Sequence, residues 1–376
     1  MIGRLEISTS ALRRNADTLR ALVAPSKCAF VVKSNAYGHG LIETALAIEN
    51  LSAAICVYAV EEAVALREGG ISVPLLILGP VPPELLTDAI YANAQVALWD
   101  VHGYLRDVVT AARDQHGRVD VHVKINTGVN RYGLEAHDAV DAIEEYLRHP
   151  ELRVAGVFSH LASAEERDSA YTTLQNDRFA KVLASVAPLF AQREIAPTAH
   201  IAASAAAMLF PQTRLDLVRV GIALYGLWPS PQIREALDGQ GIALEPALSF
   251  VSSLAATRDV VAGETIGYGG SYRAAQPTRI GVVPLGYADG IPRALSNTGA
   301  FAIDGALCPI VGRVAMNATM LDLTRAPNAR VGSPVTLIGS DGDACVGADD
   351  WARWANTINY EIVARLPAAL PRAFIE

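Results

Sequence analysis

The chain has 376 residues, of which 51% are hydrophobic, and this length predicts about two domains with large apolar cores. Its net charge of −8, without any stripe rich in lysine or arginine, excludes nucleic acid as an expected partner. The four cysteines are scattered and form no Cys-x-x-Cys pair, so neither a metal site nor a disulfide framework is expected. Because the sequence has no apolar signal core and no apolar run long enough to span a bilayer, we expect a cytoplasmic protein that binds no membrane.

The first part of the chain alternates between strand and helix patterns. A helix is predicted over residues 12–20, after the capping residues Ser8, Thr9 and Ser10 and before Pro25. Eight apolar runs follow, each separated from the next by a segment long enough for a crossover helix: 29–33, 53–59, 74–79, 95–99, 119–126, 154–160, 198–204 and 215–221. Eight strand–helix repeats predict a (β/α)8 barrel of the TIM type.

After Pro229 the pattern changes. Prolines punctuate the chain, helical periodicity nearly disappears, and short strand-like runs separated by Gly and Asp take over at 250–254, 279–283, 309–314, 320–323 and 335–339. These runs predict a second domain that is mainly β, with a final helix over 349–366. We place the barrel domain at 1–232 and the β domain at 233–376, and the first few residues could add a strand to the β domain.

Polar and charged residues collect where the predicted barrel strands end, which is where active sites of such barrels lie. They are Lys33, Tyr37, Lys124, Asn126, Arg131, His160, His200, Ser204, Arg219, Gly221 and Ile222. Single members have ordinary structural explanations, since Lys33 can reach solvent, a histidine can be inert in the core, and Ser204 can cap a helix. A buried arginine such as Arg219 keeps its charge and requires a partner, so the meeting of these groups at one rim favours a functional site.

These residue types suit an anionic, ring-bearing cofactor held by a lysine. Desolvation lowers the pKa of a lysine amine, so Lys33 could form a Schiff base, while Arg219 could face a ring heteroatom. Ser204 at a helix start and the N–H groups after Gly221 suit a phosphate. No phosphate-binding P-loop is present, and Gly267-Tyr268-Gly269-Gly270 does not open a helix after a strand, which argues against dinucleotide binding.

Several motifs, in order along nearly the whole chain, resemble those of the alanine racemase family. Residues 32–40, which begin with Val32 and Lys33 and end with Gly38-His39-Gly40, are similar to the family's pyridoxal-phosphate signature VKANAYGHG. Residues 124–133 resemble K-x-[DN]-[TS]-G-M-x-R-L-G, residues 159–162 resemble [TS]-H-[FL]-A, and residues 218–226 resemble VRxGIALYG. The loops at 267–269 and 285–290 and the segment Asn359-Tyr360-Glu361 match further family motifs.

The resemblance implies a fold type III enzyme that uses pyridoxal 5'-phosphate to interconvert L-alanine and D-alanine and so supplies D-alanine for peptidoglycan. In this family pattern Lys33 holds the cofactor and is one catalytic base, and Tyr268 from the partner subunit of a homodimer is the other. The resemblance implies that Arg131 and the Met316 N–H bind the substrate carboxylate and that Arg219 faces the pyridine nitrogen of the cofactor. The other implied cofactor-binding residues are Tyr37, His160, Ser204, Gly221, Ile222 and Tyr360. Lys124 matches a position that is often carbamylated.

The chain also departs from the family pattern. Ala315-Met316-Asn317 replaces the usual Cys-Met-Asp, and the other departures near the site are Phe158, Ala203, Tyr132 and Glu165. An asparagine after the methionine is similar to broad-specificity amino-acid racemases, so a racemase of serine, lysine and arginine is one alternative. A decarboxylase of similar architecture is opposed by Arg219 and Tyr268, and a non-racemase cofactor-binding barrel would leave the β domain without a purpose.

Overall fold

The computed structural model describes residues 3–167 and 169–376, and it divides into two compact units. The barrel unit comprises Leu12–Ser34 and Leu41–Glu245. The β unit comprises residues 3–11, Asn35–Gly40 and Pro246–Glu376. None of the helices in the described part of the chain combines the length and the apolar character that crossing a membrane requires.

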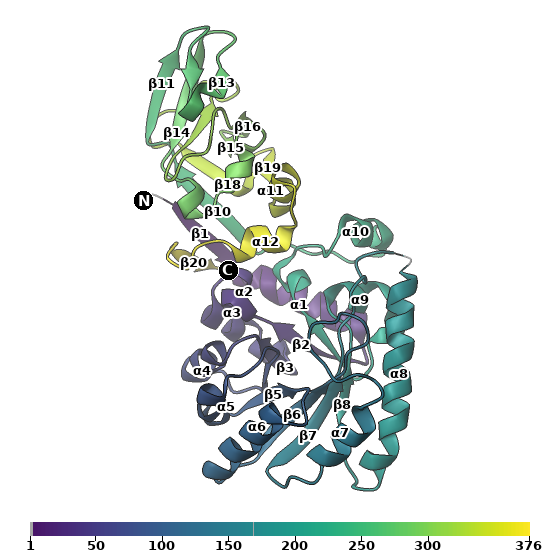
Figure 1. Ribbon diagram of the computed structural model, residues 1–376. Helices are drawn as coiled ribbons and strands as arrows, with labels where there is room; N and C mark the ends of the chain where they lie inside the picture. Colours follow the sequence, from purple (N-terminus) through teal and green to yellow (C-terminus); the bar gives the residue numbers. More distant parts are fainter. Residues whose placement is uncertain (1–2, 168) are drawn as a thin grey trace. The chain divides into compact units, whose positions relative to one another are not determined.

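The barrel unit contains eight parallel strands (Figure 1). They are β2 (Lys27–Val31), β3 (Ala54–Val57), β4 (Leu75–Ile77), β5 (Ala94–Leu98), β6 (Val119–Lys124), β7 (Leu152–Phe158), β8 (Thr198–His200) and β9 (Leu217–Val220). Neighbours pair in chain order from β2 to β8, and β9 pairs with β2. A single bridge between Ala203 and Arg219 brings β8 and β9 together, so the ring of strands is almost closed. The predicted barrel and all eight of its strands are confirmed.

Helices follow the strands and surround them in the barrel unit. The α-helices that begin in or near this unit are α1 (Thr9–Val23), α2 (Lys33–Tyr37), α3 (Leu41–Ile48), α4 (Val60–Glu68), α5 (Leu86–Tyr91), α6 (Gly103–Asp114), α7 (Ala139–Tyr146), α8 (Ala170–Ala191), α9 (Ser204–Leu209) and α10 (Pro231–Leu237). The short 3₁₀ turns are η1 (Glu49–Leu51), η2 (Pro83–Leu85), η3 (Pro211–Thr213) and η4 (Ile222–Tyr225). Local sequence sets several of their ends, because Ser169 and Ser230 cap α8 and α10 and Pro231 occupies the first turn of α10.

The β unit is built on a seven-stranded sheet in the order β16-β15-β18-β10-β1-β20, with β19 paired to β18. Its strands are β1 (Gly3–Ser8), β10 (Leu248–Ser253), β15 (Ala300–Ile303), β16 (Ala306–Pro309), β18 (Pro334–Asp341), β19 (Ala344–Val346) and β20 (Arg372–Ile375). The first strand of the chain, β1, thus lies between β10 and β20 in this sheet. The helices of this unit are α11 (Ala348–Ala355) and α12 (Asn359–Ala364), and its short 3₁₀ turns are η5 (Tyr268–Gly270), η6 (Tyr287–Asp289) and η7 (Arg293–Leu295).

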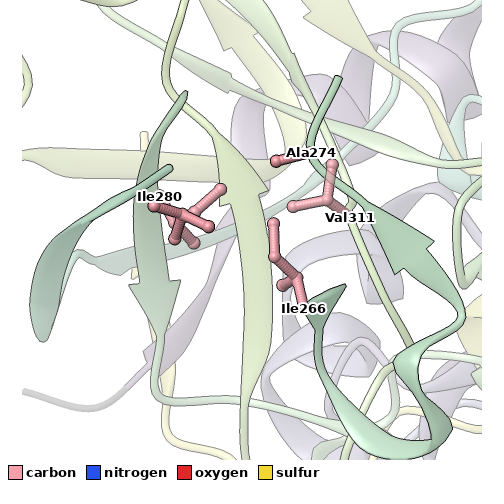
Figure 2. Packing of buried hydrophobic residues seen from close by; sticks show 5 residues of the cluster. Ile266, Ala274, Ile280 and Val311 are labelled. Carbon is pink, nitrogen blue, oxygen red and sulfur yellow. The ribbon is translucent and has the colours of Figure 1, made fainter. Parts of the chain in front are cut away.

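Two smaller sheets complete the β unit. One contains β11 (Ala256–Val260), β14 (Thr278–Val283) and β17 (Thr319–Asp322), and the other contains β12 (Thr265–Ile266) and β13 (Tyr272–Arg273). Figure 2 shows Ile266, Ala274, Ile280 and Val311, which form a buried hydrophobic cluster together with Val260. Burial of this cluster holds the segment that includes Tyr268, which lies between β12 and β13.

Two elements of the β unit differ from the sequence prediction. The run 309–314 is not a strand, because β16 ends at Pro309, only Ile310 makes an isolated bridge beyond it, and Gly312 has a φ of 78°. The predicted final helix is two helices, α11 and α12, since Asn356 between them adopts a left-handed conformation with φ 55°. An asparagine tolerates this conformation better than most residues and so ends α11.

Candidate active site

Lys33 lies just beyond the end of β2 and begins a short turn of unusual hand. The next four residues, Ser34, Asn35, Ala36 and Tyr37, all have φ between 51° and 55°. A left-handed conformation costs an L-residue about 1–2 kcal/mol, so the surrounding structure must stabilise this segment. Glu62 contributes by accepting hydrogen bonds from the Ser34 N–H at 2.5 Å and from the Tyr58 N–H at 2.9 Å. The strained turn fixes the backbone directly after the predicted catalytic lysine.

The Lys33 amine is in an environment that favours its neutral form. The side chain is half-buried, and burial lowers its pKa, as does the positive charge of Arg131. Glu62 acts in the opposite direction but is the smallest of the three effects. A lysine whose pKa is lowered is a better nucleophile and base near neutral pH, which is the chemistry that its place at the end of a buried strand predicts.

Arg219 is the most deeply buried cation of the site, with 3% of its surface exposed. Its Nη1 lies 2.6 Å from His200 Nδ1, and its Nη2 donates to the Ser159 carbonyl at 2.8 Å and lies 3.3 Å from His160 Nδ1. Among the described residues it forms no ion pair with a carboxylate. Burial lowers its pKa to about 10, so the guanidinium remains charged at neutral pH and its compensating charge must come from elsewhere.

His160 and His200 are neutral beside this arginine. The pKa of His160 is lowered to about 3, first by burial and then by the nearby cations Arg219, Arg131, Lys124 and Lys33, in that order. Burial also holds the pKa of His200 well below its usual value. Neutral histidines can accept hydrogen bonds from Arg219, which a protonated imidazolium could not do.

Lys124, at the end of β6, is 94% buried and faces aromatic rings. Its Nζ lies 5.2 Å from the centroid of Tyr132, 5.5 Å from that of Phe158 and 5.8 Å from that of Trp99. Its pKa is lowered to about 8, first by burial and then by the positive charges of Arg131, Arg219 and Lys33. The amine is therefore partly neutral near physiological pH, which is the form that reacts with carbon dioxide.

Ser204 and the turn after β9 form a buried set of backbone donors. Ser204 begins α9, and its Oγ accepts hydrogen bonds from the Gly221 N–H at 2.9 Å and the Ala223 N–H at 3.5 Å. The Ile222 N–H between them has no acceptor within the described ranges, although Ile222 is 99% buried. A buried N–H without a partner is uncommon, and a bound anion would satisfy it.

The remaining predicted site residues belong to the β unit. The rings of Tyr37 and Tyr360 lie 6.3 Å apart at an angle of 51°. Tyr268 and Met316 are large side chains that are 72% and 57% exposed within this chain. The Met316 carbonyl accepts a hydrogen bond from the Ala288 N–H, whereas the Met316 N–H has no acceptor among the residues that the structure describes.

The barrel residues as a group fit an anionic ligand. Arg131, Arg219 and Lys33 each act electrostatically on Lys124, and Glu62 is the only carboxylate among the described residues that acts on Lys33. A phosphate-bearing cofactor would supply the missing negative charge, and the Ile222 N–H would supply a donor. Within the described residues, no cluster of three or more His, Cys, Asp or Glu side chains could hold a metal ion.

The fold and the cationic rim define a (β/α)8 barrel enzyme with an anion-binding active site at the carboxyl ends of its strands. Residues 7–229 match the family model for the alanine racemase N-terminal domain, and residues 247–374 match the model for the alanine racemase C-terminal domain. The chain therefore belongs to the alanine racemase family, whose members are isomerases and generally depend on pyridoxal phosphate.

Full-length relatives and solved structures agree with this family. The chain is 38% identical to an alanine racemase of Syntrophobacter fumaroxidans over 360 residues, which cover 95% of this chain and 93% of that protein. The structure resembles that of the alanine racemase of Streptomyces lavendulae with a TM-score of 0.91 and 34% identity, covering 100% of this chain and 97% of the other. The structure also resembles that of an alanine racemase of Bacillus anthracis with bound L-Ala-P. The TM-score is 0.91 and the identity is 31%, and the match covers 100% of this chain and 95% of the other.

Three residues around the site were not singled out from the sequence as site residues. Glu62 supports the turn after Lys33, and His122 and Gln95 form a hydrogen-bonded series with His200. The alternation of β6 offered one signal, since His122 and Lys124 are two residues apart and therefore lie on the same face of the strand.

Proposed function

We propose that the chain interconverts L-alanine and D-alanine, with pyridoxal 5'-phosphate held by Lys33 and with Lys33 and Tyr268 as its two bases. The observation that carries this proposal is the group of buried or half-buried cations around Lys33, which has almost no compensating carboxylate. The names of the relatives support alanine as the substrate, and the family's general dependence on pyridoxal phosphate supports the cofactor.

The cofactor would be held by residues of the family motifs. Lys33 would bind it covalently, Arg219 would donate a hydrogen bond to the ring nitrogen, and His160 would help to position Arg219. The remaining residues would surround the phosphate: Tyr37, Ser204, Gly221, Ile222 and Tyr360. When bound, the cofactor supplies an electron sink that stabilises negative charge on the substrate Cα.

Inversion at Cα requires one base on each face of the substrate, because a single side chain cannot reach both faces. The lowered pKa of Lys33 suits it to accept the proton from one face. Tyr268 would exchange a proton with the other face, and its high exposure within this chain supports a position at the surface of a partner. We therefore propose a homodimer in which the β unit of each subunit supplies Tyr268 and Met316 to the active site of the other.

The substrate carboxylate would be bound by Arg131 and by the Met316 N–H, which lacks another acceptor among the described residues. Lys124 is proposed to be carbamylated. The ammonium group loses one proton, and the neutral amine then attacks carbon dioxide and loses a second, so a cation next to Arg131 becomes an anion that would hold the Arg131 guanidinium.

Arg219 would restrict the reaction to racemisation. Its pKa of about 10 means that it donates a hydrogen bond at neutral pH while keeping its own proton. Arg219 would therefore leave a ring nitrogen beside it unprotonated, which would make a bound cofactor a weaker electron sink and would suppress transamination. We also propose that the enzyme acts in the cytoplasm and that its product, D-alanine, is used for peptidoglycan.

The proposal is tested by chiral analysis of the products formed from a panel of L-amino acids by the purified, cofactor-loaded protein. Conversion of L-alanine far above all others is expected, and the Lys33→Ala variant is expected to convert none. Comparable conversion of serine, lysine or arginine would instead establish a broad-specificity racemase and direct attention to Asn317 and Tyr132. Absence of any D-product, with cofactor bound, would overturn the two-base proposal.

A further inference from the structure

A series of buried hydrogen bonds runs from Arg219 across the inside of the barrel to β5. Arg219 Nη1 lies 2.6 Å from His200 Nδ1, His200 Nε2 lies 2.8 Å from His122 Nδ1, and His122 Nε2 lies 2.8 Å from the Gln95 amide oxygen. Arg219, His200 and His122 are each at least 96% buried. These residues come from β9, β8, β6 and β5, so the series links strands from different parts of the ring (Figure 1).

The chemistry of the end members gives every bond in this series one direction. A guanidinium can only donate, so His200 Nδ1 must accept and carries no proton. A neutral His200 then has its proton on Nε2 and donates to His122 Nδ1. His122 in turn has its proton on Nε2 and donates to the Gln95 oxygen, which as a carbonyl oxygen can only accept. Burial lowers the pKa of His122 to about 4, which keeps this ring neutral.

The barrel is shaped to hold the His122 ring in this place. Gly156 of β7 is the register partner of His122, and a β-bulge lies at this point of the β6–β7 pairing. A Cβ atom at Gly156 would lie 2.3 Å from His122 Nδ1, so only glycine leaves room for the ring. The next ring, His200, is stacked on Phe158 with a centroid distance of 4.9 Å and an angle of 5°.

We propose that His122 and Gln95 are positioning residues for Arg219, because their hydrogen bonds stabilise the His200 tautomer whose Nδ1 accepts from the guanidinium. This inference rests on the proposed function, in which Arg219 faces the ring nitrogen of the cofactor. Loss of the Gln95 acceptor leaves the His122 N–H without a partner. His122 can then shift its proton to Nδ1 and donate to His200, which places an N–H of His200 against an N–H of Arg219.

Gln95 is a suitable position for the test because it is half-buried and lines a polar cavity of about 230 Å³. Arg67, Arg118 and Arg153 line the same cavity together with Asp120, which is paired with Arg153, so a carboxylate at position 95 would meet a net positive lining. Gln95→Leu removes the acceptor, whereas Gln95→Glu keeps it. If Gln95 only filled space, leucine would be the better tolerated of the two, since it introduces no charge. The positioning role predicts the reverse order.

The experiment compares holoenzymes of the two variants and the wild type at about pH 8.5. A carboxylate raises the pKa of a nearby histidine by about 1–3 units, so His122 is still neutral there in Gln95→Glu. Two quantities are measured: the protonation of each ring nitrogen by ¹⁵N NMR of histidine-labelled protein, and the ratio of pyruvate released to D-alanine formed from L-alanine. Release of pyruvate reports transfer of the amino group to the cofactor, which Arg219 is proposed to suppress.

In the wild type and in Gln95→Glu, we expect both His122 and His200 to have the proton on Nε2 and the product ratio to be unchanged. In Gln95→Leu we expect a second His200 tautomer and an increase in the product ratio of about fivefold, which is the effect of losing one hydrogen bond. Unchanged tautomers and an unchanged ratio in Gln95→Leu would overturn the positioning role. Arg219→Glu separates the two proposals, because an unchanged ratio in that variant would contradict the proposed role of Arg219 itself.

Discussion

Replacement of Gly156 by alanine should disturb the barrel interior far more than one methyl group normally does. The new Cβ would lie 2.3 Å from His122 Nδ1 and 2.6 Å from its Cε1. Carbon atoms in contact are ordinarily about 3.5–4.0 Å apart, so the ring has to move by more than 1 Å. His122 is hydrogen-bonded on both sides at 2.8 Å, and it cannot move this far without breaking these two bonds.

The expected cost combines two effects. Overpacking of a well-packed interior costs about 1–3 kcal/mol, and each hydrogen bond contributes about 1 kcal/mol. Because moving the ring relieves part of the overpacking, we expect Gly156→Ala to lower the free energy of unfolding by about 2–4 kcal/mol. Urea unfolding of the variant and the wild type, followed by circular dichroism, measures this difference.

Gly103→Ala is the matched control in the same unit. Gly103 is the first residue of α6, and a Cβ there would meet no atom within 4 Å. Because alanine favours a helix more than glycine does, this variant should be as stable as the wild type or up to about 1 kcal/mol more stable. If the free energy of unfolding of Gly156→Ala were also within about 0.5 kcal/mol of the wild-type value, the close packing of His122 against Gly156 would be refuted.

Two further predictions concern the cofactor site. Ser204→Ala removes the acceptor of the buried Gly221 N–H, so the free energy of unfolding of the apoprotein should fall by about 1–3 kcal/mol in urea unfolding; an unchanged value would contradict a stabilising role of this hydrogen bond. The pKa of Lys124 is about 8 in the folded state, below its ordinary value of 10.5. Between pH 8 and 10.5 the unfolded chain therefore binds more protons at Lys124 than the folded chain does, so the free energy of unfolding rises with pH. Urea unfolding in buffers free of carbon dioxide gives the difference in free energy of unfolding between the wild type and Lys124→Met. This difference should change in favour of the wild type by up to about 3 kcal/mol from pH 8 to 10.5. A difference that does not change with pH would argue against a buried cation at Lys124.

The fold of the barrel could be predicted because its signal is local and repeated. Each strand is a short apolar run bounded by polar or turn residues, and β3, β4 and β9 are buried at every position. The β unit was harder, since its strands are short and irregular. The run 309–314 has the composition of a strand, but the left-handed Gly312 prevents regular pairing there.

The cationic rim could also be predicted, because the carboxyl ends of parallel strands bring distant residues together in a known way. The left-handed turn after Lys33 could not, since Ser34, Ala36 and Tyr37 have no intrinsic preference for it and only the folded surroundings impose it. The series of hydrogen bonds from Arg219 to Gln95 likewise depends on the order in which four strands meet inside the barrel. The alternation of β6 places His122 on the face of Lys124, but it does not indicate the partners of His122.

Lys33 of one subunit and Tyr268 of its partner are proposed to act on the same substrate. A heterodimer isolated with two different affinity tags tests it, with Lys33→Ala in one subunit and Tyr268→Phe in the other. Sharing across subunits leaves one site with both bases, so the heterodimer should racemise L-alanine at about half the wild-type rate although both variant homodimers are inactive. As the control, a wild-type subunit paired with a subunit carrying both substitutions should be inactive. An inactive first heterodimer together with an active control would contradict the account, because it would place both bases in one chain.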